Sequence, residues 1–232
     1  MIDQSIFREY DIRGTVPEQL NPSTVDAIAN AIAAKCIVEG VHEIALGRDG
    51  RLSGPEIISS LSLGLRKRGI NISNVGLVTS PLLYFAAKNI DSKSGVMITG
   101  SHNPKNYNGF KVVIDDSPIS GLELLSFTHQ NIPNTEVLGQ ESHYTDLMSR
   151  YVKEVCSQSC GLKKMKVVVD CGNGAAGEIA PTLKPLSSIF SKICFSFGKF
   201  TMSPNLKMLC SLKFFPRFTE THCIQGSRFS YL

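Results

Sequence analysis

A serine at position 101 lies between two short apolar runs, in a segment whose residue types suit phosphoryl chemistry. The runs at 95–98 and 110–114 are rich in β-branched residues and predict strands, and the residues between them are turn formers. Two strands fix the ends of such a loop while its tip stays open to solvent. His102 is adjacent to the serine, and Lys111 follows ten residues on. Together they offer proton transfer and positive charge, which favours a nucleophilic serine that acts on an anionic group such as phosphate.

Alternating strands and helices around this loop predict the scaffold that positions it. Asn21 and Pro22 form a helix start, and apolar residues at helical spacing continue to Gly40. Further helices are predicted at 55–68 and 81–88, and further strands at 43–47 and 75–78. This alternation is typical of an α/β layered domain with a largely parallel or mixed sheet.

A polar, turn-rich stretch near residue 134 predicts the end of the first domain. We assign 1–133 to the domain that carries the serine loop and 134–160 to a linker and a helix. The strand at 166–170 begins a second α/β unit, which we assign to 161–183. A lone strand and helix bury little apolar area, so 161–232 is expected to be poorly ordered or aggregation-prone unless it docks on the first domain.

Composition excludes several classes of protein. The chain has 232 residues, 42% of them hydrophobic, which suffices for a real core. It has no apolar run of 18 residues and no basic and apolar leader, so neither a membrane span nor a signal peptide is expected. The seven cysteines are scattered, and Cys156 and Cys160 lack a neighbouring histidine. Reduced thiols in a cytoplasmic protein are therefore favoured over a zinc site.

The formal charge of +4 comes from the last fifth of the chain. Residues 1–183 carry 17 Lys and Arg against 19 Asp and Glu, whereas residues 184–232 carry 7 against one, Glu220. A basic arm for nucleic acid or an anionic membrane is one interpretation. We favour an unrelated C-terminus, such as a translated wrong reading frame, because acids and periodicity are lost at one point. The other two frames beyond codon 183 test this hypothesis, and a disordered tail without nucleic-acid or membrane partners is expected.

Four segments in order resemble one family. Together these segments, one of which is the serine loop, resemble the alpha-D-phosphohexomutases, in particular the bacterial phosphomannomutase/phosphoglucomutase branch, over residues 1 to about 183. The resemblance implies a first domain with a mixed sheet sandwiched by helices. The segments are FREYDIRG at 7–14, GRDGRLSG at 47–54, TGSHNP at 99–104 with YNGFK at 107–111, and VVDCGNGA at 168–175.

The resemblance assigns catalytic roles around the loop. It implies that Ser101 carries the phosphoryl group as phosphoserine and that Lys111 is the general acid/base, which also binds substrate. His102 is expected either to orient the phosphate or to hydrogen-bond the turn. The ordinary alternatives are a loop serine and a solvated strand lysine.

Arg13 is a further catalytic and substrate-binding candidate, and the remaining candidates bind substrate or shape the loop. In the family, a Tyr and an Arg at the positions of Tyr10 and Arg13 approach the phosphoserine, and arginine offers a planar fork that matches phosphate. Asn103 is a candidate substrate ligand, although asparagine also bonds nearby backbone groups and so holds loops. Arg48 and Arg51 are predicted to position this loop or the phosphate, with an ion pair to Asp49 as the alternative.

The implied reaction moves phosphate between O1 and O6 of a hexose phosphate, such as that of mannose or glucose, through a bisphosphate intermediate. In the family, Mg²⁺ bridges the phosphate on the residue at Ser101 and three later aspartates. No Asp follows Asp170, so we expect no tight Mg²⁺ binding and negligible turnover by this chain. The alternative is a non-catalytic folded remnant or partner-binding domain.

The G-x-G-x-x-G at 172–177 is interpreted as a tight turn rather than a dinucleotide site. The oligomeric state stays open.

Overall fold

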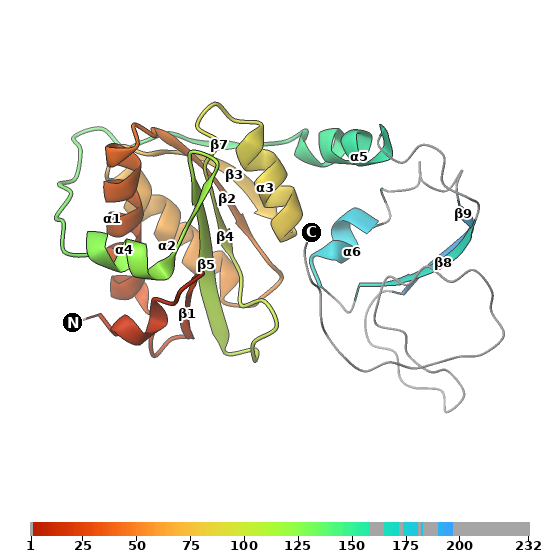
Figure 1. Ribbon diagram of the computed structural model, residues 1–232, viewed down its shortest axis with the longest axis horizontal. Helices are drawn as coiled ribbons and strands as arrows, with labels where there is room; N and C mark the ends of the chain where they lie inside the picture. The colour runs from red at the N-terminus through yellow and green to blue at the C-terminus, as the bar shows by residue number, and fades with distance from the viewer. Residues whose placement is uncertain (1, 158–164, 172–173, 181, 183–189, 197–232) are drawn as a thin grey trace. The chain divides into compact units, whose positions relative to one another are not determined.

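The computed structural model describes residues 2–157, 165–171, 174–180, 182 and 190–196, which fall into two compact units that divide after Met148 (Figure 1). The first unit holds a seven-stranded sheet in the order β1–β5–β4–β2–β3–β7, with β6 paired to β5 outside this path. Its strands are β1 (Ile12–Thr15), β2 (Glu43–Arg48), β3 (Asn71–Leu77), β4 (Gly95–Ile98), β5 (Tyr107–Ile114), β6 (Ser117–Ile119) and β7 (Glu141–His143).

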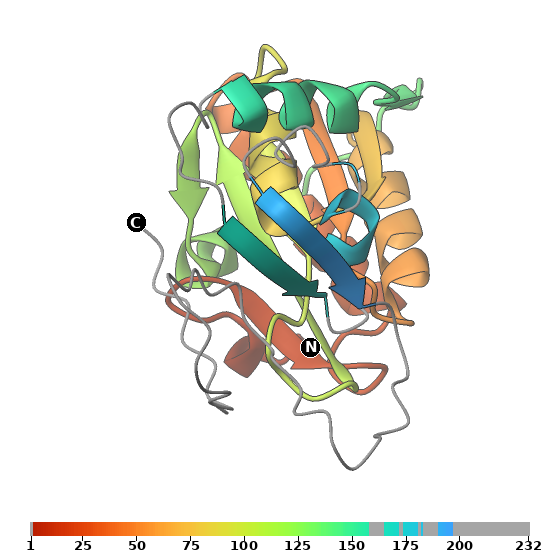
Figure 2. The ribbon, with the colours of Figure 1, turned by 90° about the vertical axis from the view of Figure 1, so that its right-hand side faces the viewer.

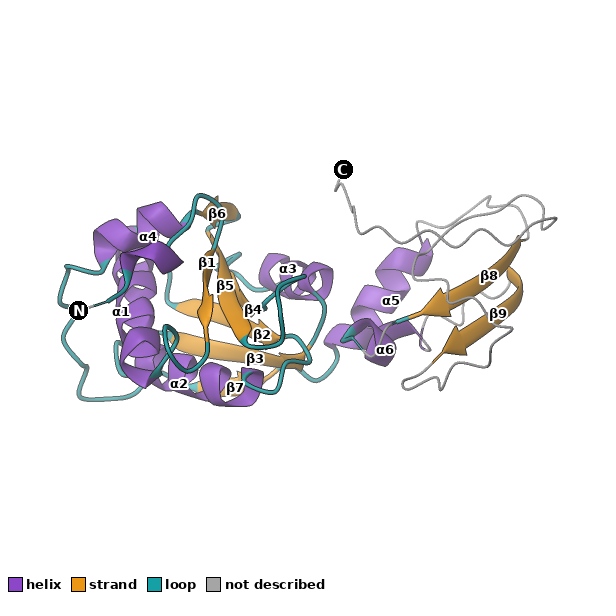
Figure 3. Ribbon diagram, turned by 90° about the horizontal axis from the view of Figure 1, so that it is seen from below, coloured by secondary structure: helices purple, strands orange, loops and turns teal. Residues whose placement is uncertain are grey.

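The sheet is mixed, and helices cover both of its faces. Strands β2, β3, β4 and β7 pair in parallel, whereas β5 runs antiparallel to β1, β4 and β6. Helices α1 (Pro22–Val38), α2 (Gly54–Arg66) and α4 (Gly121–Phe127) lie on one side, and α3 (Ser80–Lys88) lies on the other (Figure 3). A short 3-10 helix, η1 (Gln4–Ile6), precedes β1. The predicted α/β architecture with a sheet sandwiched by helices is confirmed.

Local sequence explains how α1 begins and how closely it packs. The Asn21 side chain accepts a hydrogen bond from the backbone N of Thr24 at 3.0 Å, and Pro22 occupies the first helical position. On the facing helix, a Cβ at Gly64 would lie 2.7 Å from the Cβ of Ala29. The two small residues therefore allow α1 and α2 to approach closely over the sheet.

The core lies between these two helices and the sheet. Fully buried side chains from both layers form one cluster, and each contributes about 1.5–3 kcal/mol by leaving water. Phe110 on β5 is the largest of them, at 1% exposed. Even-numbered residues of β5 from Asn108 to Ile114 are buried, while Lys111 on the opposite face is not. The alternation along β5 thus places the core residues on one face of the sheet and the candidate catalytic Lys111 on the other.

Cys36 on α1 provides a test of this packing. It is fully buried, and desolvation raises the pKa of its thiol to about 12. Because thiolate is the reactive form, on the order of one in ten thousand molecules would present it at pH 8. We expect a thiol reagent to leave Cys36 unlabelled in the native protein and to label it only in denaturant, as mapped by mass spectrometry. Rapid native labelling at Cys36 would contradict this packing, and the half-buried Cys156 and Cys171 provide the reference.

The segment after residue 133 belongs to the first unit rather than to a linker. Strand β7 pairs in parallel with β3, and Glu141 fixes it there. The Glu141 carboxylate accepts hydrogen bonds from Ser62 at 2.8 Å and from Asn74 at 2.9 Å, and it pairs with Arg66 at 3.2 Å. Because of this backbone pairing and polar network, the first unit extends to Met148 and does not end at the predicted residue 133.

The second unit contains α5 (Leu147–Ser157), which begins just before the boundary, β8 (Met165–Asp170), α6 (Ala176–Ile179) and β9 (Phe190–Ser196). Strands β8 and β9 run side by side in the same direction (Figure 2). A bond from Gly174 N to Cys171 O at 2.8 Å closes the turn between β8 and α6. Strand β9 falls where the sequence predicts an irregular tail. The predictions for 158–164, 183–189 and 197–232, including Cys160 and most of the tail, lie outside the described residues.

None of the helices that the structure describes has the length and apolar character required to cross a bilayer.

Candidate functional site

The Ser101 loop, residues 99–106, connects β4 to β5. These strands pair antiparallel directly behind it, with Ile98 opposite Phe110 and Met97 opposite Lys111. A bond from Thr99 N to Gly109 O at 3.0 Å continues the ladder into the base of the loop. Both ends of the loop are thus fixed by the sheet, as the sequence predicts for this serine.

Asp49, at the end of the neighbouring strand β2, anchors the start of the loop. Its Oδ2 accepts hydrogen bonds from Thr99 Oγ1 at 2.8 Å and from Gly100 N at 3.3 Å, while its Oδ1 accepts from Arg51 N at 3.0 Å. Parallel pairing of β2 with β4 brings Asp49 to this position, because Arg48 lies opposite Ile98. The carboxylate therefore binds two elements that are distant in sequence.

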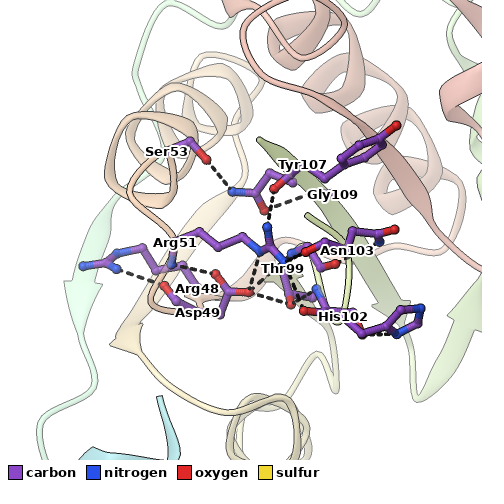
Figure 4. Close-up of polar contacts among 12 residues, drawn as sticks. Arg48, Asp49, Arg51, Ser53, Thr99, His102, Asn103, Tyr107 and Gly109 are labelled. Atoms are coloured by element: carbon purple, nitrogen blue, oxygen red, sulfur yellow. Dashed lines mark hydrogen bonds and ion pairs between the residues drawn. The ribbon is translucent and has the colours of Figure 1, made fainter. Parts of the chain in front are cut away.

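Arg51 lies against the other side of the loop (Figure 4). Its Nη1 donates to the carbonyl oxygens of Pro104 at 2.6 Å and Tyr107 at 2.9 Å. Its Nη2 donates to those of Ser101 at 3.0 Å and Asn103 at 2.7 Å, and its Nε faces Asp49 Oδ2 at 3.5 Å. Both interpretations of Arg51, loop positioning and an ion pair with Asp49, therefore hold at once. Arg48 instead donates to the Asp49 backbone oxygen at 3.0 Å.

Ser101 occupies the exposed tip of this arrangement. Its φ of +52° lies in the left-handed region, which costs a non-glycine residue about 1 kcal/mol or more. A bond from Ser101 N to Thr99 Oγ1 at 2.9 Å supports that conformation. The Ser101 Oγ lies 3.4 Å from Nδ1 of His102, which is exposed as well. The structure thus places the predicted nucleophile beside a histidine in open solvent.

Asn103 stabilises the turn of the Ser101 loop. Its side-chain Nδ2 and its backbone N both donate to Gly100 O, at 2.9 Å and 3.0 Å. These two hydrogen bonds support the alternative role of Asn103, in which it stabilises the loop.

Arg13 and Lys111 come together on the neighbouring strands β1 and β5. The Arg13 Nη2 bonds the Asp11 carboxylate, and Lys111 Nζ lies 3.5 Å from the same oxygen, Asp11 Oδ2. Within the described residues, no hydrogen bond or ion pair joins either cation to Ser101. Arg13 Nε is buried and lacks a hydrogen-bond partner there. Tyr10 beside them is 78% exposed. The cations thus form a cluster with Asp11 on this sheet edge.

Sequence reasoning did not single out Asp11 or Asn108. Asp11 lies just before β1, two residues from Arg13, and this spacing carried the signal, since residues two apart in extended chain share one face. Asn108 is fully buried, donates to Ser53 Oγ at 2.9 Å and ties β5 to the start of α2. It looked like an ordinary turn residue, so its role was not visible without the fold.

The carboxylates at the site do not fit a metal centre. The described residues contain no group of three or more His, Cys, Asp or Glu side chains that could hold a metal ion. Asp11 Oδ2 already pairs with Arg13 and Lys111, and Asp49 is bonded on both oxygens. These carboxylates are thus engaged by cations and by hydrogen-bond donors rather than arranged as ligands for a divalent ion.

The chain is similar to known proteins over about four fifths of its length. The family described as "Phosphoglucomutase/phosphomannomutase, alpha/beta/alpha domain I" matches residues 4–123. A Pseudomonas syringae pv. tomato phosphomannomutase/phosphoglucomutase is 44% identical over 185 residues, covering 79% of this chain and 40% of its own length. A phosphoglucomutase of Neisseria meningitidis serogroup B is 42% identical over 187 residues, with 78% and 40% covered.

Solved structures agree with these sequence matches. A phosphoglucomutase/phosphomannomutase family protein from Burkholderia thailandensis superposes with a TM-score of 0.75 at 33% identity, covering 85% of this chain and 44% of its own. A structure named as a phosphomannomutase from Thermus thermophilus has a TM-score of 0.65 at 21% identity, covering 84% of this chain and 46% of its own, which shows the fold alone. The chain spans about 40% of the length of the curated relatives that it matches.

Proposed function

The chain belongs to the phosphoglucomutase/phosphomannomutase family, and from this premise we propose that Ser101 carries a phosphoryl group in transfer to and from hexose phosphates. The part of the reaction that we assign to this chain is the transfer to and from Ser101, and the complete isomerisation is proposed for full-length members of the family. Relatives named for both mannose and glucose phosphates make these two hexoses the proposed substrate class.

One observation carries the proposal: an exposed serine hydroxyl on a loop that is held from both sides. The strands β4 and β5 fix the ends of the Ser101 loop, while Asp49 and Arg51 fix its interior. A nucleophile so held needs little reorganisation when a phosphate arrives, which favours transfer through positioning. An ordinary surface serine has no such support.

Two cations on strands β1 and β5 suit an anionic reactant. Arg13 and Lys111 place two cations on adjacent strands, and their shared partner Asp11 keeps them together before any phosphate binds. Phosphoryl transfer depends mainly on positioning and on stabilising negative charge, so these two cations support the proposal. We assign proton transfer to Lys111 and to His102, whose Nδ1 lies 3.4 Å from Ser101 Oγ.

The proposed reaction has two transfers. In the first, the bond between phosphorus and Ser101 Oγ breaks while a bond forms from phosphorus to a free hydroxyl of a hexose monophosphate. The attacking hydroxyl loses its proton and Ser101 Oγ gains one, which yields a hexose bisphosphate. In the second, the other phosphate returns to Ser101 Oγ, and its former sugar oxygen takes up the proton. The net change moves phosphate between O1 and O6 of the sugar.

A single transfer tests this proposal without requiring turnover. We expect the purified chain, incubated with glucose 1,6-bisphosphate or mannose 1,6-bisphosphate, to gain the mass of one phosphoryl group. Peptide mapping should place that group on Ser101. No gain in mass with either donor, or a phosphoryl group on another residue, would refute the proposal.

A further inference from the structure

We propose that Arg51 is the positioning residue of the Ser101 loop: its guanidinium is the template around which the loop takes the conformation that presents the serine. The claim about phosphoryl transfer rests on the proposed function, whereas the claim about loop conformation does not. Arg51 would act through the loop and would not touch the phosphate.

The two Nη groups of Arg51 bond four carbonyl oxygens, and its Nε forms an ion pair with Asp49. A guanidinium has five N–H donors in a fixed plane. Four face the carbonyl oxygens of Ser101, Asn103, Pro104 and Tyr107, and the fifth faces the Asp49 carboxylate. The side chain is 14% exposed. With its four Nη hydrogens bonded to carbonyl oxygens and its Nε turned toward Asp49, this guanidinium has no Nη donor left to bind a phosphate.

Gly100 provides the space in which the guanidinium lies. A Cβ at position 100 would sit 2.2 Å from both Cζ and Nε of Arg51. Such a clash could be relieved by a free arginine, but this one is held by four carbonyls and a carboxylate. The glycine and the arginine therefore form one packing unit, and a change in either should disturb the same loop.

The Asp49–Arg51 pair reaches both sides of the Ser101 residue. Arg51 Nη2 holds the Ser101 carbonyl oxygen. On the other side, Ser101 N donates to Thr99 Oγ1, and that hydroxyl donates to Asp49 Oδ2. The left-handed φ of Ser101 is thus supported from both flanking peptide groups. Loss of the guanidinium releases one of these supports, so the serine should leave its presented conformation.

Two variants disturb this unit in different ways. Arg51→Lys keeps the charge, but an ammonium has three donors on a compact head and lacks the planar fork. Gly100→Ala keeps the arginine and displaces it. Arg68→Lys is the matched control, since Arg68 is also a well-bonded arginine of the first unit, held by Asp26, Asn30 and Gly64 far from the loop in sequence.

Hydrogen exchange measures the loop directly. The amides of Ser101, Asn103 and Tyr107 donate within the loop and should be protected in the wild type. We expect exchange of a peptide covering 99–108 to rise about tenfold or more in Arg51→Lys and in Gly100→Ala. Arg68→Lys should leave that peptide unchanged. Unaltered loop exchange in both test variants would overturn the inference.

Phosphoryl uptake from glucose 1,6-bisphosphate separates positioning from phosphate binding. We expect the maximal rate of uptake to fall about a hundredfold in Arg51→Lys, with the half-saturating donor concentration nearly unchanged. A raised half-saturating concentration at an unchanged maximal rate would instead show that Arg51 binds the phosphate, and would overturn the inference. If the wild type takes up no phosphoryl group, the proposed function fails, and loop exchange alone decides the role of Arg51.

Discussion

Replacement of Ser101 by alanine is expected to abolish phosphoryl uptake from a hexose bisphosphate and to leave the fold intact. The hydroxyl is the group that forms the bond to phosphorus, so no partial activity should remain. Alanine at this exposed position keeps the same backbone strain as serine, and the free energy of unfolding should change by less than about 0.5 kcal/mol. Intact mass and urea unfolding measure the two results.

Ser126→Ala is the control for that experiment. Ser126 is also exposed, and its hydroxyl donates to the Glu123 carbonyl oxygen on α4. We expect this variant to take up phosphate as the wild type does. Phosphoryl uptake that persists in Ser101→Ala would move the acceptor to another residue and end the proposed role of the loop.

Replacement of Gly109 by alanine is expected to destabilise the first unit by about 3 kcal/mol or more. A Cβ there would lie 2.2 Å from the Ile12 carbonyl oxygen and 3.3 Å from the Arg13 Cα. Both are backbone atoms of β1, which pairs with β5 at this point, so no side-chain rotation relieves the clash. Strand β1 must shift, and Arg13 shifts with it. The midpoint of urea unfolding measures the loss of stability.

Gly50 offers a matched comparison on the same unit. It is exposed, and a Cβ there would meet no atom within 4 Å. Gly50→Ala should change the free energy of unfolding by less than about 1 kcal/mol. Equal stabilities of the two alanine variants would mean that β1 does not pack against β5 as described.

Much of the fold was accessible from local patterns. The capping pair Asn21–Pro22 located the start of α1, and Gly40, with a φ of +69°, follows the C-cap Glu39 and ends the helix as predicted. The apolar runs located β4 and the second half of β5, and the turn residues between them located the Ser101 loop. These signals are local: caps, β-branched runs and glycines act over a few residues, so a single sequence reveals them.

The missed elements depend on distant partners. Strand β7 has three exposed residues and no apolar alternation, so nothing in its own sequence predicts a strand. Pairing with β3 and the bonds of Glu141 to α2 and β3 define it. Strand β3 begins at Asn71 rather than at the predicted 75, because pairing with β2 orders its polar first half. Such elements follow from the assembled sheet.

The candidate site divides in the same way. Ser101, His102 and Asn103 share one loop, and their proximity follows from the chain itself. The link from Asp49 and Arg51 to this loop spans about fifty residues and required the parallel pairing of β2 with β4. The pairing of Asp11 with Lys111 likewise arises from the antiparallel contact of β1 with β5. Residue types indicated the chemistry, and topology determined which cations face which carboxylates.

The four carbonyl oxygens bonded to Arg51 restrict changes in the length of the loop during evolution. Each of the four belongs to a fixed position along the hairpin tip, so one added or deleted codon there would move an acceptor away from the guanidinium. A one-residue slip within β5 would also turn Lys111 toward the apolar side. Descendant sequences should therefore accumulate replacements at solvent-facing positions such as Lys105 and Asn106 long before they tolerate a change in the number of residues between the two strands.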